Sequence, residues 1–417
     1  MGVGMMTRKI RLSALVAGAL LVAGCGGGGG PSGSNPSGTT AAPASSAPPA
    51  ATTDPAVATT VEGGGYVSVV TDEIIDNPDF DALEQRILGV VSEVGLPGAS
   101  LLVVHAGELV EQQTWGEYAL DTKVPIASAS KWFSGALLMT LVDEGLLALD
   151  EPVSTYVEEL DGTPHGRITL RQMLSFTTGL ISDDLVPCYS SPDSTLQECA
   201  VQFVREPLAH QPGAQYRYHS GHLMMAGALA EIVTGQSFEE LFQERIAVPL
   251  GMTSTRFLHN KDPSRVPVTF PNPAGGAVST LGDYARFLEM LVNGGLAPDG
   301  TRILTPESIA EMETNQTEGL PMRGSAFRVN TKAPYGLGHW IDWTYPDGST
   351  MVDSSPGKFG FRGWIDREND VFGVYMVVDQ SDDNDPDSTP AGGSWIYEMS
   401  AEAVGGALPQ ATYPHRR

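Results

Sequence analysis

The sequence predicts a protein of mixed helices and strands, in the α/β (α+β) class, behind a long unfolded leader. Its 417 residues are enough for one large domain or two ordinary ones. Apolar residues recur at helical spacing in three stretches, which begin near Ser128, Leu223 and Phe238. Residues 26 to about 65 contain almost no large apolar side chain, so the fold must begin after them.

The chain starts with the features of an export signal. Basic residues between positions 8 and 11 precede an apolar run from Ala14 to Ala23, and the run ends at Gly24-Cys25. This order is typical of a signal peptide, here residues 1–24, and the run is too short to span a membrane as a helix. Leu-Val-Ala-Gly-Cys at 21–25 resembles the bacterial lipobox, in which the cysteine is lipidated. An ordinary cleaved signal with a chance cysteine is the alternative.

Residues 25–70 are expected to form a disordered tether of Gly, Ser, Pro and Ala, and residues 71–410 the folded domain. About 40 flexible residues would reach roughly 35 Å from the membrane. The net charge is −26, from 50 acidic and 24 basic residues, which argues against a nucleic-acid partner.

The spacing Ser128-Ala129-Ser130-Lys131 is the clearest chemical motif. Side chains three apart share a helix face, so the Lys131 amine would lie beside the Ser128 hydroxyl. A serine hydroxyl needs such a neighbouring base to become a useful nucleophile. Ser355-Pro356-Gly357-Lys358 has the same spacing, but Pro and Gly inside the turn oppose a helix there. A helix-start serine followed by a surface lysine is the alternative for the first copy.

Two further segments contain predicted helices. Ile168 to Leu174 is predicted to be a short helix ending in a Gly turn, and Tyr218-His219-Ser220 leads into the apolar helix from about Leu223 to Val233. A tyrosine polarised by a lysine could relay a proton to Ser128. By residue type alone, however, a Tyr packed under a helix cap is the commoner case.

Cys188 and Cys199 lie in a polar stretch of a chain that carries an export signal, so a disulfide between them is expected. Two free thiols are the alternative. No His-Glu-x-x-His or comparable spacing occurs among the eight histidines, and His219 and His222 have no local carboxylate or Cys partner. The sequence therefore predicts no metal and no cofactor.

The order of motifs resembles the class C β-lactamase-related serine hydrolases, a group that includes β-lactamases, penicillin-binding proteins, D-peptidases and esterases. The resemblance covers about residues 81–379. It rests on these blocks: Gly95 to Leu101, Ser128 to Lys131, Leu170 to Leu180, Pro212 to Phe257, Pro273 to Thr280 with Asp283, Tyr335 to Gly338, and Ser355 to Gly357.

The resemblance implies roles for residues. Ser128 would be the nucleophile, Lys131 its lysine and Tyr218 the general base. The backbone N–H groups of Ser128 and Lys358 would form the oxyanion hole, which stabilises charge on the carbonyl oxygen. Ser220, Ser355 and Gly357 would line the substrate site.

The fold implied is serine β-lactamase-like: an antiparallel sheet flanked by helices, with a mainly helical region inserted at about 146–301. The expected strands are at about 99–104, 108–115, 336–343, 360–366 and 371–378. The active site would lie where the sheet and the helical region meet.

The sequence departs from the family's pattern at two places. Ser220 stands where Tyr-x-Asn would have Asn, and so offers a short hydroxyl in place of an amide. Ser355 stands where Lys or His is usual, so a charge is missing that Lys358 or Arg362 could replace. Both departures weigh against efficient β-lactam hydrolysis more than against an esterase or peptidase.

These observations together predict an exported serine hydrolase that acts through an acyl-enzyme on an amide or ester. The expected partners are a small-molecule or peptidoglycan-derived substrate and a membrane, reached through lipid on Cys25. A monomer is expected, facing the periplasm or the cell exterior. The alternative from another class is a non-catalytic cell-envelope protein that binds peptidoglycan in a lactamase-like pocket.

Overall fold

A computed structural model describes residues 68–71, 74, 79–181, 186–191, 193–323, 334–380, 390–393 and 395–407. The predicted signal peptide, Cys25 and nearly all of the predicted tether lie outside these residues. Ser68 and Val69 hydrogen-bond Glu289, and Val70 is only 3% exposed. The folded domain therefore includes residues that the sequence assigned to the end of the tether.

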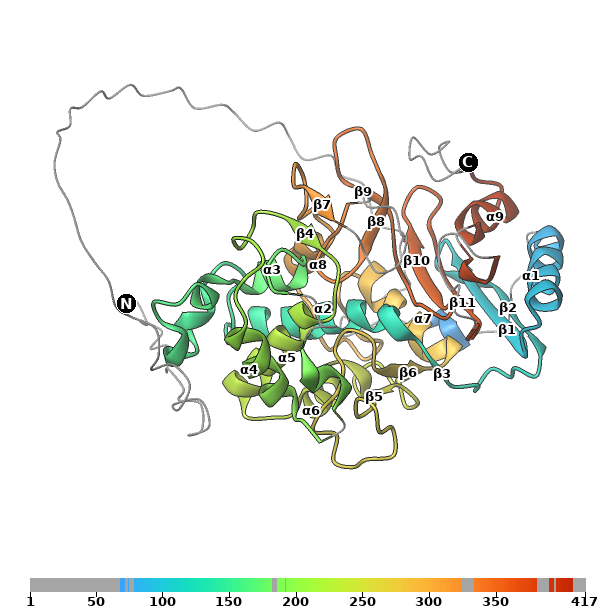
Figure 1. Ribbon diagram of the computed structural model, residues 1–417. Helices are drawn as coiled ribbons and strands as arrows, with labels where there is room; N and C mark the ends of the chain where they lie inside the picture. The colour runs from blue at the N-terminus through green and yellow to red at the C-terminus, as the bar shows by residue number, and fades with distance from the viewer. Residues whose placement is uncertain are drawn as a thin grey trace, which may run out of the picture.

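The main sheet has six antiparallel strands in the order β2-β1-β11-β10-β9-β8 (Figure 1). The strands are β1 (Gly98–His105), β2 (Glu108–Gly116), β8 (Trp340–Thr344), β9 (Thr350–Pro356), β10 (Arg362–Asp366) and β11 (Val371–Met376). Strands from the two ends of the folded chain thus pair in the middle of the sheet, as expected from the resemblance.

Helices cover both faces of this sheet, so its central strands are buried on both sides. In β1, Leu101 and Val103 pack in the core under α1 (Asp81–Val94) and α9 (Ile396–Ala403). Leu102 and Val104 point the other way, into the core beneath α7 (Leu281–Val292). Because successive strand side chains alternate between faces, a strand buried twice reads as a continuous apolar run.

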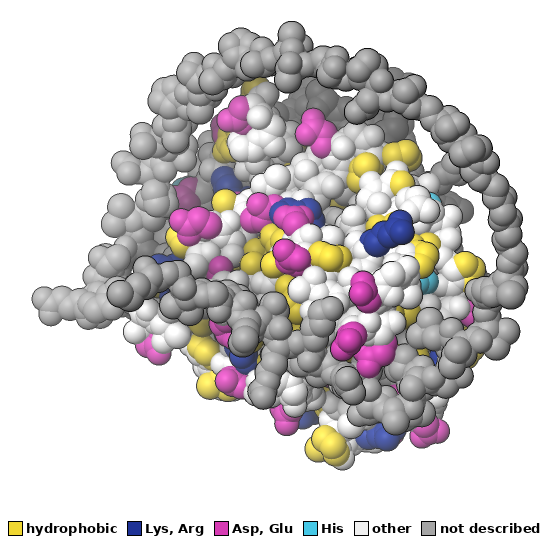
Figure 2. Space-filling view, turned by 90° about the vertical axis from the view of Figure 1, so that its left-hand side faces the viewer, with side chains coloured by type: hydrophobic (Ala, Val, Ile, Leu, Met, Phe, Trp, Pro, Cys, Tyr) yellow, Lys and Arg dark blue, Asp and Glu magenta, His cyan; other side chains and the backbone are white. Residues whose placement is uncertain are grey.

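A mainly helical region lies beyond the β8 edge of the sheet (Figure 1). Its elements are α3 (Leu170–Leu174), α4 (Leu196–Arg205), α5 (Gly221–Thr234), α6 (Phe238–Phe242) with a π-helical turn at Gln243–Ala247, and α8 (Pro306–Met312). Small sheets join it to the rest: β3 (Val124–Pro125) with β6 (Ala277–Ser279) and β5 (Arg256–Phe257), and β4 (Tyr216–Arg217) with β7 (Met322–Arg323). On the face seen in Figure 2, acidic side chains are scattered among a few basic ones.

Helix α2 (Ser130–Asp143) runs through the centre of the molecule and is buried on every side. A helix buried on every side is expected to be mostly apolar. In α2 the buried exceptions are Ser130, Lys131, Ser134 and Thr140. Gly135 and Gly338 allow the loop before β8 to touch it. A Cβ on Gly135 would lie 2.4 Å from the Leu337 carbonyl oxygen, and one on Gly338 would lie 2.6 Å from that of Lys131.

Three points of the sequence analysis need correction. No strand was expected at 350–356, where β9 lies, and the expected strand at 336–343 is a loop up to residue 339. Ser128 does not begin the α-helix, because it lies in a 3₁₀ turn, η2 (Ala127–Ala129), that precedes α2. Among the described residues, no helix has the length and apolar character needed to cross a bilayer.

Glu111 of β2 should make stability depend on pH. It is 4% exposed, and burial, followed by the charge of Glu84, raises the pKa of Glu111 to about 7. A raised folded-state carboxyl pKa stabilises the fold below the unfolded-state value and loses that contribution as pH rises through about 7. Glu111→Gln should therefore unfold at a higher temperature than wild type at pH 8.5, with a smaller difference at pH 4. Equal differences at both values would contradict this.

Gly135→Ala should destabilise the fold, since the added methyl meets a backbone carbonyl that cannot swing aside. We expect a loss of about 1–3 kcal/mol in the free energy of unfolding, typical of overpacking. Gly282→Ala in α7 is the matched control, because its nearest side-chain atoms are 3.6 and 3.8 Å away. Chemical denaturation that gave equal stabilities for the two variants would refute the close-approach argument.

Candidate functional site

Ser128 lies on the η2 turn, partly exposed between the buried Ala127 and Ala129. Ala127 has a φ of 46°, in the left-handed region that residues other than glycine seldom adopt. The Ser130 hydroxyl donates to the Ala127 carbonyl at 2.6 Å and accepts from the backbone N–H of Ala277 at 3.0 Å. Strained backbone held by its surroundings is frequent at functional sites, and here it presents the Ser128 hydroxyl.

Lys131 lies in the first turn of α2 and is 3% exposed. Its Nζ is 2.9 Å from Ser128 Oγ and donates to the carbonyl oxygen of Ala274. The same nitrogen lies over the Tyr218 ring, 4.8 Å from its centre. Ser128, Lys131 and Tyr218, predicted as one catalytic group, are therefore neighbours.

Tyr218 is fixed by aromatic packing between β4 and α5. Its ring stacks on Trp340 at 5.6 Å between ring centres and meets Phe176 edge-on at 5.1 Å. It is 9% exposed. The sequence left two possibilities for Tyr218, a packed side chain or a partner of the lysine. In the structure Tyr218 is packed and also lies beside Lys131.

His222 supports this arrangement from behind. Its Nδ1 is 2.8 Å from Thr178 Oγ1, and its Nε2 is 2.8 Å from the carbonyl oxygen of Arg217, the residue before Tyr218. Burial, then the neighbouring His219, holds the pKa of His222 well below its ordinary value. A neutral ring that donates from Nε2 to the carbonyl and accepts from the Thr178 hydroxyl satisfies both contacts. In the described part of the chain, no three His, Cys, Asp or Glu side chains are placed so that they could hold a metal ion.

The end of β9 forms the opposite wall. β8 begins at Trp340, which pairs with Ser354. The next residues of β9 therefore pair only with β10, and their other edge faces the η2 turn. Ser355 is 3% exposed, and its hydroxyl donates to the carbonyl oxygen of Ser128 at 3.4 Å. A Cβ on Gly357 would lie 2.2 Å from the carbonyl oxygen of Ile126. The predicted substrate-site residues Ser355 and Gly357 therefore pack against the turn that carries Ser128.

The charge that Ser355 lacks is not replaced by Arg362. This side chain is 1% exposed, donates to the Gly392 carbonyl at 3.0 Å and contacts the Tyr397 hydroxyl of α9. Its side chain points to the face of the sheet that α9 covers, away from α2. Successive side chains of a strand alternate between the two faces, so only the neighbouring position on β10 faces α2. Lys358 is exposed at the turn after β9.

Sequence reasoning missed a charged cluster beneath β9, in which Asp353 and His339 are buried and Arg367 and Glu313 are partly exposed. Arg367 contacts Asp353 at 3.1 Å and Glu313, and His339 Nε2 is 3.4 Å from Asp353 Oδ2. Burial raises the pKa of Asp353, but Arg367 and His339 hold it below the ordinary value. The cluster joins β9 to Glu313, directly after α8. Its member Asp353 lies on β9, two residues before Ser355. His339 directly follows the Tyr335 to Gly338 block, which was the available signal.

A second polar group was also missed. Tyr189 Oη lies 3.3 Å from Ser220 Oγ and accepts from Asn272 Nδ2 at 3.3 Å. The Asn272 amide oxygen accepts from the backbone N–H of Ala274 at 3.0 Å. Ser220 thus belongs to a network with residues whose sequence context gave no motif.

The Cys188–Cys199 disulfide, as expected, is formed.

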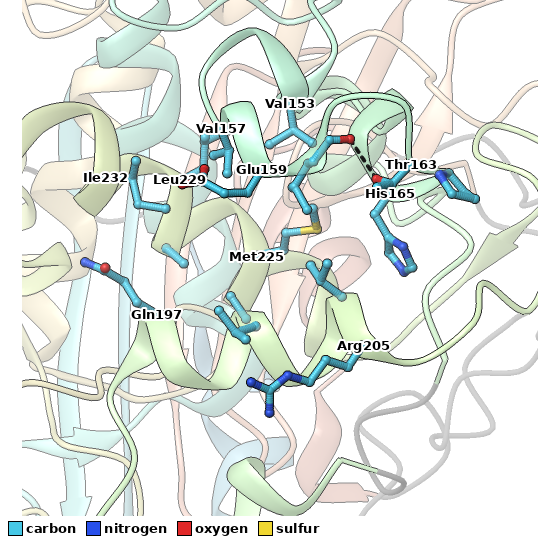
Figure 3. A pocket seen from close by; sticks show the side chains of 16 residues that line it. Val153, Val157, Glu159, Thr163, His165, Gln197, Arg205, Met225, Leu229 and Ile232 are labelled. Carbon is cyan, nitrogen blue, oxygen red and sulfur yellow. Dashed lines mark hydrogen bonds between the residues drawn. The ribbon is translucent and has the colours of Figure 1, made fainter. Parts of the chain in front are cut away.

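A separate pocket of about 540 Å³ lies within the helical region, away from Ser128. Figure 3 shows Val157, Met225, Leu229 and Ile232 around it, with Glu159, Gln197, Arg205 and His165 also on its wall. Ser128, Lys131 and Tyr218 are not among its lining residues. We assign the chemistry to the Ser128 region, because that is where the nucleophile and amine are in contact.

Comparison with known proteins agrees with this geometry. The Beta-lactamase family model matches residues 80–391. Penicillin-binding protein 4 of Amycolatopsis lactamdurans is 27% identical over 317 residues, which cover 67% of this chain and 80% of that protein. An uncharacterized protein of Mycobacterium tuberculosis (strain CDC 1551 / Oshkosh) is 27% identical over 363 residues, covering 73% and 88%.

Solved structures share the fold. A crystal structure from Bacteroides dorei DSM 17855, which bears a provisional beta-lactamase name, is 30% identical with a TM-score of 0.69 and covers 79% of this chain and 100% of that one. The D-amino acid amidase of Ochrobactrum anthropi SV3 has a TM-score of 0.59 at 22% identity, covering 78% and 99%. With the family match across most of the described residues and a serine and lysine in contact at its motif, the chain belongs to the Beta-lactamase family.

Proposed function

We propose that this protein is an exported serine hydrolase that cleaves an amide or ester through an acyl-enzyme on Ser128. The observation that carries the proposal is the 2.9 Å contact between Lys131 Nζ and Ser128 Oγ. A nucleophile within hydrogen-bond reach of a base, with the base itself oriented by other groups, is the general arrangement for covalent catalysis. The Ala274 carbonyl and the Tyr218 ring orient Lys131.

In the proposed reaction, Lys131 in its neutral form takes the proton as Ser128 Oγ attacks the carbonyl carbon. The backbone N–H groups of Ser128 and Lys358 stabilise the oxyanion. Tyr218 carries the proton to the leaving amine or alcohol. Water then attacks the acyl-enzyme, gives its proton to the same pair and releases the acid, while Ser128 regains its hydrogen.

The substrate class we favour is a peptide or ester of the cell envelope. A relative named penicillin-binding protein supports this, as does a protein of Escherichia coli O157:H7 with a provisional D-alanyl-D-alanine carboxypeptidase name, 24% identical over 393 residues. Ser355 brings no positive charge to bind a β-lactam carboxylate. The same absence favours the second candidate function, a non-catalytic binding protein. Such a protein would acquire no covalent adduct from a serine-reactive probe.

A fluorophosphonate probe should add one adduct, on Ser128, and none on Ser355. The reason is that Ser128 is partly exposed beside Lys131, whereas Ser355 is 3% exposed with its hydroxyl on the Ser128 carbonyl. Intact-mass spectrometry with peptide mapping is the measurement, and parallel incubation with a penicillin tests β-lactam acylation. Heat-unfolded protein and Ser128→Ala are the controls. An adduct on Ser355, or no adduct at all, would contradict the proposal that the protein is an enzyme acting through Ser128.

Lys131→Ala and Tyr218→Phe should each lower ester turnover by at least about a hundredfold, the usual scale for acid–base groups. Steady-state kinetics on a p-nitrophenyl ester provides the measurement, and circular dichroism checks that each variant is folded. Near-full activity of Tyr218→Phe would remove Tyr218 from the proton path. His219 or Ser220 would then be the better candidate.

We also propose that lipid on Cys25 anchors the protein to a membrane, facing the periplasm or the cell exterior. Cys25→Ser should move the protein from the membrane fraction to the soluble one and leave it active, because acyl chains provide about 0.8 kcal/mol of membrane affinity per buried CH₂. Fractionation of expressing cells, followed by the activity assay, is the measurement. A variant that remained in the membrane pellet would contradict the lipobox assignment.

A further inference from the structure

A cavity of about 540 Å³ lies in the helical region, separate from the site around Ser128 (Figure 3). Its walls come from three parts of the chain: the short 3₁₀ turns at residues 153–165, α4 and α5. This volume falls within the range of about 300–1,000 Å³ that is typical of small-molecule sites. Because Ser128, Lys131 and Tyr218 do not line it, the cavity can take a ligand of its own.

The interior of the cavity is aliphatic. It is formed by side chains such as Val153, Leu160, Met225 and Leu229, each at most 7% exposed. Among the described residues that line the cavity, His165 is the only one with an aromatic ring. Ring-shaped groups prefer stacked or edge-on ring partners, while aliphatic and thioether side chains adapt to a flexible chain. The lining therefore favours an alkyl chain over a planar ring.

A cation stands at the exposed edge of the cavity. Arg205 ends α4, lines the cavity and is exposed. Its guanidinium forms no ion pair or hydrogen bond with any other residue that the structure describes. A guanidinium presents paired N–H donors that match the two oxygens of a carboxylate. Arg205 therefore offers a binding point for the anionic end of a ligand.

The second charged side chain on the wall sets the orientation of such a ligand. Glu159 lies across the cavity from Arg205, with Met225 between them in the view of Figure 3. Its carboxylate would repel an anion, and it has an interaction of its own. The amide of Gln197 is engaged as well, since it donates to Glu231 at 3.2 Å. The anionic end is therefore expected beside Arg205, and the chain among the aliphatic side chains.

We propose that this cavity binds a medium-chain carboxylate, a free fatty acid, with its alkyl chain among the aliphatic side chains and its carboxylate on Arg205. The bound chain would lie against α5, the helix that directly follows Tyr218-His219-Ser220. This inference adds a second site to the protein and does not depend on acyl transfer at Ser128.

Isothermal titration calorimetry of the purified protein with hexanoate, octanoate and decanoate tests the inference. Affinity should rise about fourfold per added CH₂ until the cavity is filled, which corresponds to about 0.8 kcal/mol per buried CH₂. Decanol, which lacks the charge, should bind about three- to tenfold more weakly than decanoate, and Arg205→Gln should remove this difference. Equal affinity of the wild type for decanol and decanoate, or no binding of either, would overturn the inference.

A variant that narrows the cavity locates the ligand. Ala200 lines the cavity from α4, so Ala200→Phe should lower the affinity for decanoate more than that for hexanoate. Ala119→Phe is the matched control, because the same change at an exposed position outside the cavity should alter neither affinity. If Ala200→Phe does not fold, the chain-length series and Arg205→Gln decide. Decanoate binding that a folded Ala200→Phe leaves unchanged would place the ligand elsewhere and overturn the inference.

Discussion

The whole site depends on a lysine nitrogen that is buried at the start of a central helix. Burying such a group costs free energy unless acceptors surround it. Lys131 meets the Ser128 hydroxyl, the Ala274 carbonyl and the face of the Tyr218 ring. Each contact comes from a different segment: the turn before α2, the loop before β6, and the residues between β4 and α5. The Lys131 nitrogen therefore holds these three segments next to one another.

Close backbone approach builds the other side of the site. Glycines at 135, 338 and 357 let carbonyl groups come nearer than any side chain would permit. The first two bring the loop before β8 onto α2, and the third brings the end of β9 onto the η2 turn. His339, on that loop, stacks on Trp132 of α2 at 4.8 Å and contacts Asp353 of β9. The wall opposite Tyr218 is therefore built from backbone packing and a largely buried ion cluster, and Ser355 contributes a hydroxyl there, not a cation.

The helical region provides the opposite side of the site. Tyr218, Ser220 and Tyr189 all come from it, and the disulfide fixes η7 (Pro187–Ser190) on α4. The sheet and α2 hold Ser128 and Lys131, while the helical region brings Tyr218 against them.

The sequence by itself determined what depends on local spacing and on ordered motifs. The Ser128–Lys131 contact follows from three-residue spacing, the helices after 221 and 238 from apolar periodicity, and the β1 and β2 strands from the family blocks. The tertiary structure alone decided which distant residues meet. Strand β9 was missed because polar residues buried in an ion cluster, such as Asp353, hide its apolar pattern. Arg362 points away because strand side chains alternate, and the contact of Tyr189 with Asn272 spans 83 residues that no local pattern relates.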